Sequence, residues 1–491
     1  MRQTTVSSHD GNSEDKGDRI LEEQASSSTS GTLVDLPTLP TTLRQKVGIT
    51  IMASAVSFLS LFAVGMYFPV IEDIGNEIQI DTPKIYSTIT VYMIFQAISP
   101  PFWGYWADIH GRRPIFLLSL LFYNLSNVGL ALTYNYPMLI CFRILQAFAT
   151  SSTIGVGAGV IADITTPDER GSFQGWYSLG STLGAAIGPM VGGLISQHYG
   201  WRSSFWCLCV LSLVLWWAVF FFLPETLEPH YPEQQRPHHT SNNEKQFDKK
   251  DMQSRSIWNL CLFPLFESVS FVKYKDVLNM VLLYGFQYAS GYAVTVMTPV
   301  VLCGPDYDLD ATTIGFAYLA HGGGCFLASI LQGFILNHDY HQLHTSSDSF
   351  IVYARLRRVL PNALAYNVLL VVYGWCIYTH APLALLLAMH FFLGATSQSI
   401  LNSIQVLLTD LFPYRIASIT ACNNFYRCLF GAFATTTIRP ACDVMGYGWS
   451  YSLVSGILLC SRLCPALEIK YGSCWQQDRS GEKPETQHEP S

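Results

Sequence analysis

Two arginines stand inside long apolar runs of the sequence, where a permanent charge is costly. Arg143 lies a few residues into one run, and Arg427 lies inside a later one. A charged side chain in a bilayer interior costs at least about 2.5 kcal/mol, so both are candidates for a functional role. Gln146 and Thr150 share a helical face with Arg143 and are expected to line a polar path. Alternatively, the Arg143 guanidinium reaches out to the lipid headgroups.

Carboxylates are scarce in the apolar runs, and none falls in the middle of one. Glu72 and Asp73 follow the first run and are interpreted either as proton carriers or as surface anchors. His321 and His390 are able to titrate near neutral pH, although a single histidine in a membrane more often packs and hydrogen-bonds. The sequence therefore does not identify which residue would carry a proton.

A short turn between two apolar runs brings together one acid and two arginines. The segment reads Gly104-Tyr-Trp-Ala-Asp108-Ile-His-Gly111-Arg112-Arg113. A glycine at a tight turn, an acid ending one helix and arginines opening the next favour a functional turn over a merely polar one. The alternative is an ordinary turn that follows the positive-inside rule.

Aromatic and amide side chains recur at helical spacing in two of the apolar runs. Tyr92 and Gln96 share one helix face, as do Tyr284, Gln287 and Tyr288. A pocket lined in this way suits flat organic molecules through stacking and cation–π contacts. Helix packing is the alternative for each of these residues, and His321 is a weaker candidate for the same pocket.

A stripe of glycines is the strongest packing signal. Gly180, Gly184, Gly188 and Gly192 recur every fourth residue, next to Pro189 and Gly193. Glycine in a helix costs about 1 kcal/mol relative to alanine in water, and proline removes a backbone donor. In a bilayer, small residues instead allow two helix backbones to touch. The stripe is therefore predicted to be the close-packing seam of a membrane bundle.

The composition is that of an integral membrane protein. Half of the 491 residues are hydrophobic and only 13% are charged, against about 25% in soluble domains. The net charge of −7 comes without a basic face, so nucleic acid is not an expected partner. The thirteen cysteines show no zinc spacing, and no metal or other cofactor is expected.

Twelve apolar segments have about the 20 residues that cross a bilayer. We therefore predict an all-α protein with twelve transmembrane helices. The predicted spans are 47–71, 85–107, 115–133, 138–164, 173–197, 202–223, 277–300, 312–336, 359–379, 382–408, 417–438 and 449–466.

The distribution of charge orients these spans. Basic residues fall mainly in alternate loops, which places both termini in the cytoplasm and leaves the outer loops acidic. The predicted organisation is a disordered cytoplasmic tail (1–46), a six-helix bundle (47–223), a cytoplasmic linker (224–276), a second six-helix bundle (277–466) and a cytoplasmic tail (467–491).

The two bundles carry signs of an internal repeat. Asp410 follows Asp163 by 247 residues, and Trp449 follows Trp201 by 248, each pair in similar local sequence. Two repeated halves form the architecture in which substrate binds near the midplane between halves that rock. In this repeat Gly180 corresponds to Arg427, so the second half lacks most of the glycine stripe.

The turn Gly104 to Arg113 resembles the loop signature of the major facilitator superfamily. Arg143 with Gln146, and the glycine stripe, resemble its antiporter signatures. With Leu223-Pro-Glu-Thr226, the sequence looks most like the fungal twelve-span drug:proton antiporters, in the branch that exports quinidine-like compounds. The resemblance covers about 47–466, and the run from Asn423 to Arg427 and Cys428 is similar to the same family.

The resemblance implies roles for individual residues. Asp108 and Arg112 would form a charge relay with Asp163, and Arg143 would take part in proton transfer or its electrostatic control. Such a network acts as a latch, because charge pairs favour the conformation in which they meet. Arg355, Arg357 and Arg358 occupy the corresponding loop of the second half without the preceding Gly-x-x-x-Asp, so a degenerate latch is expected there.

The expected activity is export of an organic compound, such as a drug, toxin or secondary metabolite, in exchange for protons. Importing a nutrient such as a polyamine or organic acid is the alternative, and a transporter-like sensor is a more distant one. The absence of a phosphate-binding loop argues against ATP-driven transport, and no enzyme site is evident. A monomer in the plasma membrane is expected. Substrate, direction and proton stoichiometry stay open.

Overall fold

The computed structural model describes residues 42–165, 167–226, 266, 269–343, 353, 355–412 and 416–480, and these residues form helices and short connections. The predicted tail 1–46 and linker 224–276 lie mostly outside the described residues.

Helix starts follow local rules, as the start of the helix at Tyr136 shows. The Asn135 side chain accepts a hydrogen bond from the Met138 N–H at 3.0 Å. Pro137 follows in the first turn, where a missing N–H costs nothing.

The first half of the chain contains eight helices among its described residues. They are α2 (Leu43–Tyr67), α3 (Ile71–Ile78), α4 (Thr82–His110), α5 (Arg112–Ala131), α6 (Tyr136–Thr150), α7 (Ser152–Ile164), α8 (Pro167–Tyr199) and α9 (Trp201–Phe222).

The second half begins with a single 3-10 turn and continues as long helices. Its elements are η2 (Phe271–Lys273), α12 (Lys275–Leu302), α13 (Ala311–Leu343), α15 (Val359–Tyr378), α16 (Leu383–Leu411), α17 (Ile416–Ser461) and α18 (Leu463–Ser480).

The predicted twelve-span fold is confirmed. Among the described residues, nine helical stretches are long and apolar enough to cross a membrane. One of them, Ser418–Gly472, bends at Gly446, where φ is +77°, and so supplies two spans. Helices α4 and α12 run within the same bundles and complete the twelve.

Several boundaries differ from the predicted spans. The first helix ends at Tyr67, and Glu72 and Asp73 lie in the separate helix α3. The fourth span is broken at Ser151 into α6 and α7. After a turn at Arg462, helix α18 continues to Ser480, into the predicted tail 467–491.

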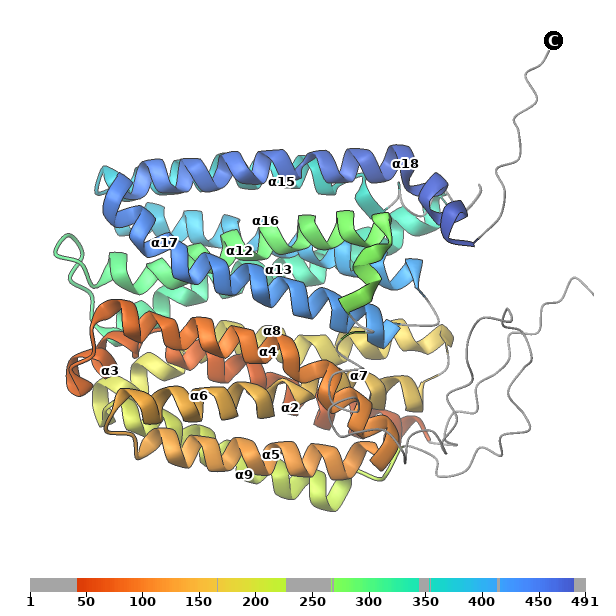
Figure 1. Cartoon of the computed structure of the whole chain (residues 1–491), viewed down its shortest axis with the longest axis horizontal. Helices are drawn as coiled ribbons and strands as arrows, with labels where there is room; N and C mark the ends of the chain where they lie inside the picture. Colours follow the sequence, from red (N-terminus) through yellow and green to blue (C-terminus); the bar gives the residue numbers. More distant parts are fainter. Residues whose placement is uncertain are drawn as a thin grey trace, which may run out of the picture.

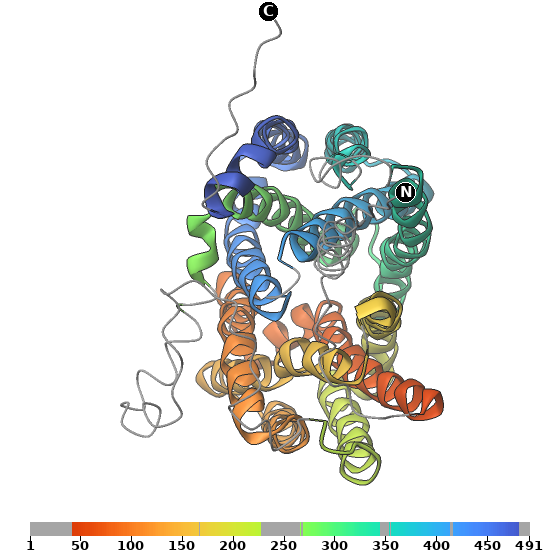
Figure 2. The same cartoon turned by 90° about the vertical axis from the view of Figure 1, so that its right-hand side faces the viewer.

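The helices form two layers, with α2–α9 in one and α12–α18 in the other (Figure 1). In the first half α2 packs on α8, α4 on α6 and α7, and α5 on α9; in the second, α12 packs on α17, α13 on α16, and α15 on α16 and α17. Figure 2, viewed along the helices, shows the helices of each half grouped together and the two halves in contact. Contacts between the halves run mainly from α8 to α13 and from α4 to α17.

The end of the molecule that carries α3, which we call the Glu72 end, is closed by contacts between the halves. Glu72 forms an ion pair with Arg439 at 3.6 Å, and the Thr90 hydroxyl lies 3.0 Å from that of Thr435. Phe68 of the first half stacks on Tyr318 of the second, with ring centroids 6.1 Å apart. The opposite end, which holds the α4–α5 turn, is called the Arg112 end.

Candidate functional site

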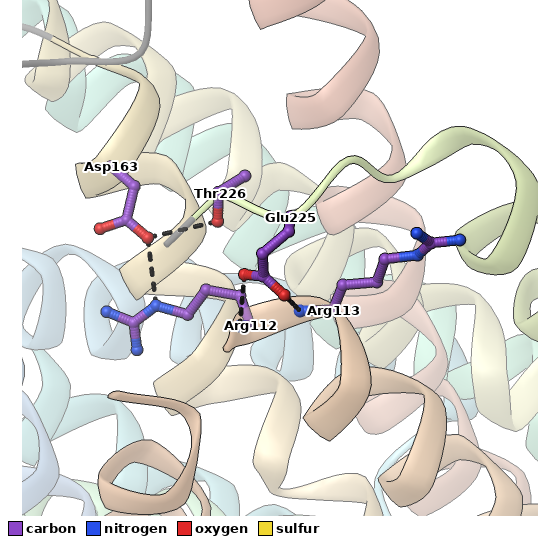
Figure 3. A network of polar contacts seen from close by, with 5 residues as sticks. All are labelled: Arg112, Arg113, Asp163, Glu225 and Thr226. Carbon is purple, nitrogen blue, oxygen red and sulfur yellow. Dashed lines mark hydrogen bonds and ion pairs between the residues drawn. The ribbon is translucent and has the colours of Figure 1, made fainter. Parts of the chain in front are cut away.

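The predicted relay residues Arg112 and Asp163 meet at the Arg112 end (Figure 3). Arg112 Nε donates to Asp163 Oδ2 at 3.1 Å, and both side chains are largely buried. The Thr226 hydroxyl donates to the same Asp163 oxygen at 3.3 Å. The cluster therefore connects the start of α5 to the ends of α7 and α9, all within the first half.

A carboxylate that the relay prediction did not include holds the start of α5. Glu225 accepts the backbone N–H of Arg112 at 2.8 Å and that of Arg113 at 3.2 Å. A carboxylate at this position satisfies two free N–H groups and faces the positive end of the helix dipole. Glu225 belongs to the Leu-Pro-Glu-Thr run noted in the sequence, but its partner was not evident there.

Two glycines shape this cluster. Gly111 adopts φ +103°, and a Cβ there would lie 2.5 Å from a Glu225 oxygen. At Gly159 of α7, a Cβ would lie 2.7 Å from the Arg112 Cζ, so the missing side chain leaves room for the guanidinium. Gly104 lies inside α4 with open space around it, so the tight-turn glycine is Gly111. Only the helical backbone of Asp108 is described.

The second half has a matching ion pair. Arg355 Nε lies 2.9 Å from Asp410 Oδ2, at the end of α16. The latch of the second half is therefore degenerate only in its missing Gly-x-x-x-Asp sequence, because the arginine and the acid still meet. Asp410 is the residue that corresponds to Asp163 in the internal repeat.

Arg143 is buried in the first half. Its side chain is 1% exposed, and the guanidinium lies over the rings of Tyr67 and Tyr92, 3.8 and 4.4 Å from the centroids. Its Nη1 donates to Gln146 Oε1 at 2.7 Å, and Gln146 Nε2 donates to Asn127 Oδ1 at 2.8 Å. The headgroup alternative for Arg143 is wrong, because aromatic faces hold the cation inside the bundle.

Arg427 has a similar environment in the second half. Its Nε donates to Asn424 Oδ1 at 3.0 Å, and its guanidinium lies 5.2 Å from the centroid of Tyr288. Tyr284 interacts with it electrostatically as well. The arginine therefore lies between α12 and α17, with tyrosines where a counter-ion would otherwise be expected.

The predicted pocket residues separate into two groups. Tyr92, Gln96, Tyr284 and Tyr288 lie near the two arginines: the Gln96 carbonyl accepts the Asn424 side chain at 3.2 Å, across the contact between α4 and α17. Gln287 instead donates to Ser397 at 3.1 Å and accepts from Arg462 at 2.8 Å. Sharing a face of α12 therefore did not bring Gln287 to the same site as the tyrosines.

The two histidines lie side by side in the second half, with His390 buried and His321 partly buried. The rings of His321 and His390 lie 6.2 Å apart, and His390 Nε2 lies 2.8 Å from the Tyr373 hydroxyl. A hydrogen bond to a tyrosine hydroxyl fits a packing role. Among the described residues, neither histidine is shown in contact with Arg427. A proton-carrying role for either ring stays a prediction.

The glycine stripe packs against α2, backbone to backbone. Cβ atoms at Gly180 and Gly184 would run into the carbonyls of Ser54 and Phe58, and one at Gly188 would lie 2.7 Å from the Phe62 carbonyl. Gly192 faces the Met66 carbonyl, Pro189 packs against Gly65, and Gly193 faces Ala311 of the second half. The corresponding helices of the second half, α12 and α17, meet differently, because the Phe430 side chain of α17 packs on Gly285 of α12.

Metal chemistry has no candidate among the described residues, where no group of three His, Cys, Asp or Glu side chains is placed to hold an ion. The eleven described cysteines are free thiols. What the site offers instead is buried charge and aromatic surface between two helical halves, which is suited to binding and not to bond-making.

The sequence matches the family model of the Major Facilitator Superfamily over residues 53–435. The chain belongs to the major facilitator superfamily. It is therefore a multi-pass membrane transporter of the secondary type and not an enzyme. Within this superfamily it is 30% identical over 468 residues to citrate exporter 1 of Aspergillus niger, with 89% of this chain and 88% of the relative aligned.

The chain is also similar to a drug-resistance protein and to a solved transporter structure. Quinidine resistance protein 1 of Saccharomyces cerevisiae is 26% identical, over 89% of this chain and 85% of the relative. The crystal structure of a D-xylose-proton symporter superposes with a TM-score of 0.65 at 16% identity, covering 86% of this chain and 96% of the symporter. At this identity the likeness establishes the fold alone.

Proposed function

We propose that the protein exports an organic compound in exchange for protons, by alternating access between its two halves. The observation that carries this proposal is the contrast between the two ends of the molecule. The Glu72 end is closed by contacts between halves, whereas the charged network of Arg112, Asp163 and Glu225 lies within one half. Rocking of the halves can therefore open one end without breaking that network.

Charge supports the proposed orientation in the membrane, and the relatives support the proposed direction of transport. Arg112, Arg113 and Arg355 lie at the Arg112 end, and acids such as Glu72 and Glu77 at the other, which favours a cytoplasmic Arg112 end with both termini inside. Relatives named as a citrate exporter and a quinidine resistance protein support export across the plasma membrane. They also support the drug:proton antiporter branch suggested by the sequence.

The candidate residues receive specific roles in this proposal. The network of Arg112 and Asp163, with Asp108, fixes the surface that meets the second half when the cytoplasmic end closes. Arg143 and Arg427 set the electrostatic field around the substrate. The glycine seam between α8 and α2 keeps the first half rigid, so that it moves as a unit.

Inside-out plasma-membrane vesicles from cells producing the protein test the coupling to protons. We expect a substrate found by a resistance screen to accumulate in vesicles with an acidic interior, while K⁺ and valinomycin hold the membrane potential at zero. Accumulation should stop when nigericin collapses the pH gradient. Vesicles without the protein are the control. Accumulation that survives loss of the gradient rejects proton exchange, and accumulation of labelled substrate by intact cells favours the importer alternative.

A further inference from the structure

Two cations, the buried Arg143 and the partly buried Arg427, reach one short stretch of α4 from opposite halves. Arg143 lies over the Tyr92 ring, and Arg427 is bonded to Asn424, whose side chain donates to the Gln96 carbonyl. Tyr92 interacts electrostatically with both Arg143 and Tyr292 of α12. The Tyr292 ring is tilted against that of Tyr288, with centroids 4.8 Å apart, and Tyr288 is the tyrosine that Arg427 faces. The segment Tyr92 to Gln96 therefore connects the two guanidinium environments.

Neither cation is neutralised by an acid of the described chain. None of the ion pairs formed by described residues includes Arg143 or Arg427, and their electrostatic neighbours are tyrosines and Cys428. The acids seen in ion pairs, such as Glu72 and Asp163, lie toward the two ends of the molecule. A buried charge is stable when it is paired, so the buried Arg143 calls for a negative partner. The partly buried Arg427 adds a second positive charge on the other side of Tyr92 to Gln96.

The same place holds hydrogen-bond donors with no acceptor. Arg143 Nε and Gln96 Nε2 are buried without partners, as are the hydroxyls of Tyr92 and Tyr123 next to Arg143. A guanidinium and an amide nitrogen only donate, so the missing component is an acceptor. An ionised carboxylate supplies acceptors alone and binds arginine through two parallel bonds.

We infer that the transported compound is an organic anion, whose carboxylate is bound between Arg143 and Arg427 beside Tyr92 and Gln96. This inference rests on the proposed export function and names its substrate class. The tyrosine rings around both arginines give the carbon body of the anion an apolar surface. In a cell with a negative interior, the membrane potential itself drives such an anion outward, in addition to any proton gradient.

Access to this site depends on the contact between the halves. The Gln96 carbonyl is held by Asn424, and Cys428 Sγ lies 4.0 Å from Gln96 Oε1, so the donors are covered while α4 and α17 touch. When the halves separate along this contact, the donors are exposed to a substrate. The site therefore belongs to the moving interface, as a substrate site in a rocking transporter must.

Thermal unfolding of the purified full-length protein in detergent tests the inference without any transport step. The probes are benzoate and succinate, their neutral analogues benzamide and succinamide, citrate, and the cation tetraphenylphosphonium. We expect at least one carboxylate to raise the Tm with a saturable dependence on concentration, and its neutral analogue to have no effect. Arg143→Gln and Arg427→Gln should each weaken the apparent affinity by about tenfold or more, because each removes a charge-assisted bond.

Matched variants separate this effect from general damage. Lys84→Gln removes a cation from the exposed Glu72 end, where Lys84 pairs only with Asp81 among the described residues, and should keep the wild-type response. If Arg143→Gln is not produced in folded form, Arg143→Lys keeps the charge but loses the planar fork, and should also weaken the response.

The inference is overturned if no carboxylate raises the Tm, if the amides or the cation do so equally, or if both glutamine variants respond like wild type. Its failure is distinct from failure of the proposed function. Proton-coupled export of a cation or an amide, with no carboxylate binding, supports the proposed function and rejects an anionic substrate. A carboxylate that binds but is transported independently of the pH gradient supports an anionic substrate and rejects proton exchange.

Discussion

At the scale of single residues, one carboxylate and one glycine explain how the Arg112 network is assembled. Glu225 ties the end of the first half to the N-terminus of α5, and Gly111 is the position whose positive φ and closeness to Glu225 exclude a side chain. Arg112 is then free to cross toward α7 and meet Asp163 at 3.1 Å. The position of the cation therefore depends on backbone hydrogen bonds as well as on its own ion pair.

Asp163→Asn tests the ion pair at this scale. The change keeps the size of the side chain and removes the charge opposite Arg112, which is nearly buried. Because a hydrogen bond to a charged group is worth about 1.5–3 kcal/mol, we expect the maximal export rate to fall by about tenfold. Substrate affinity, measured by thermal shift, should stay close to wild type, since the network lies away from the two central arginines.

The double variant Arg112→Gln/Asp163→Asn should be no worse than the worse single variant, because residues of one network are not additive. Asp81→Asn is the matched control, since it breaks an exposed pair with Lys84 that contributes little. Full export by Asp163→Asn would show that the pair is only part of a polar turn.

Sequence reasoning found some of these residues and missed others for a physical reason. Arg143 was evident because a charge in an apolar run is conspicuous by itself. Glu225, Gly159 and Asn127 were not, because each matters only through a partner that is distant in sequence. Gln287 was misplaced for the same reason: its helix face was predictable, but not which helices cover it.

At the scale of elements, the seam between α8 and α2 shows how a glycine at every fourth residue allows two helices to pack closely against each other. Successive glycines of α8 meet successive carbonyls of α2, at Ser54, Phe58, Phe62 and Met66. The two periods match because both helices repeat about every 3.6 residues. The sequence indicated the seam but not the helix on the other side of it, because α2 carries no comparable stripe.

Gly188→Leu tests this seam. A Cβ at this position would lie 2.7 Å from the Phe62 carbonyl and 3.1 Å from the Gly65 Cα, so leucine forces α8 and α2 apart. We expect export to be lost, while the protein is still inserted and detected in the membrane fraction. Gly175→Leu is the control on the same helix, because nothing lies within 4 Å of a Cβ there. Normal pumping by Gly188→Leu would mean that the seam tolerates bulk and has no mechanical role.

At the scale of the whole molecule, the sequence indicated the number of helices and the division into two halves, since both follow from hydropathy and repeats. It did not reveal which end is closed, because that depends on contacts such as Glu72 with Arg439 between segments far apart in the chain. An anion moving outward across an inside-negative membrane gains about 2.3 kcal/mol per charge for each 100 mV. In the proposed export cycle, opening of the Glu72 end would be the step that commits a bound substrate to release.

The most direct test of alternating access is a reversible lock on the Glu72 end. The hydroxyls of Thr90 and Thr435 lie 3.0 Å apart across the halves, so the pair Thr90→Cys/Thr435→Cys is within reach of a disulfide. Each single cysteine variant serves as a control for the native thiols. We predict that oxidation of the double variant stops export and that a reducing agent restores it. Export at the wild-type rate by fully cross-linked protein would contradict the account.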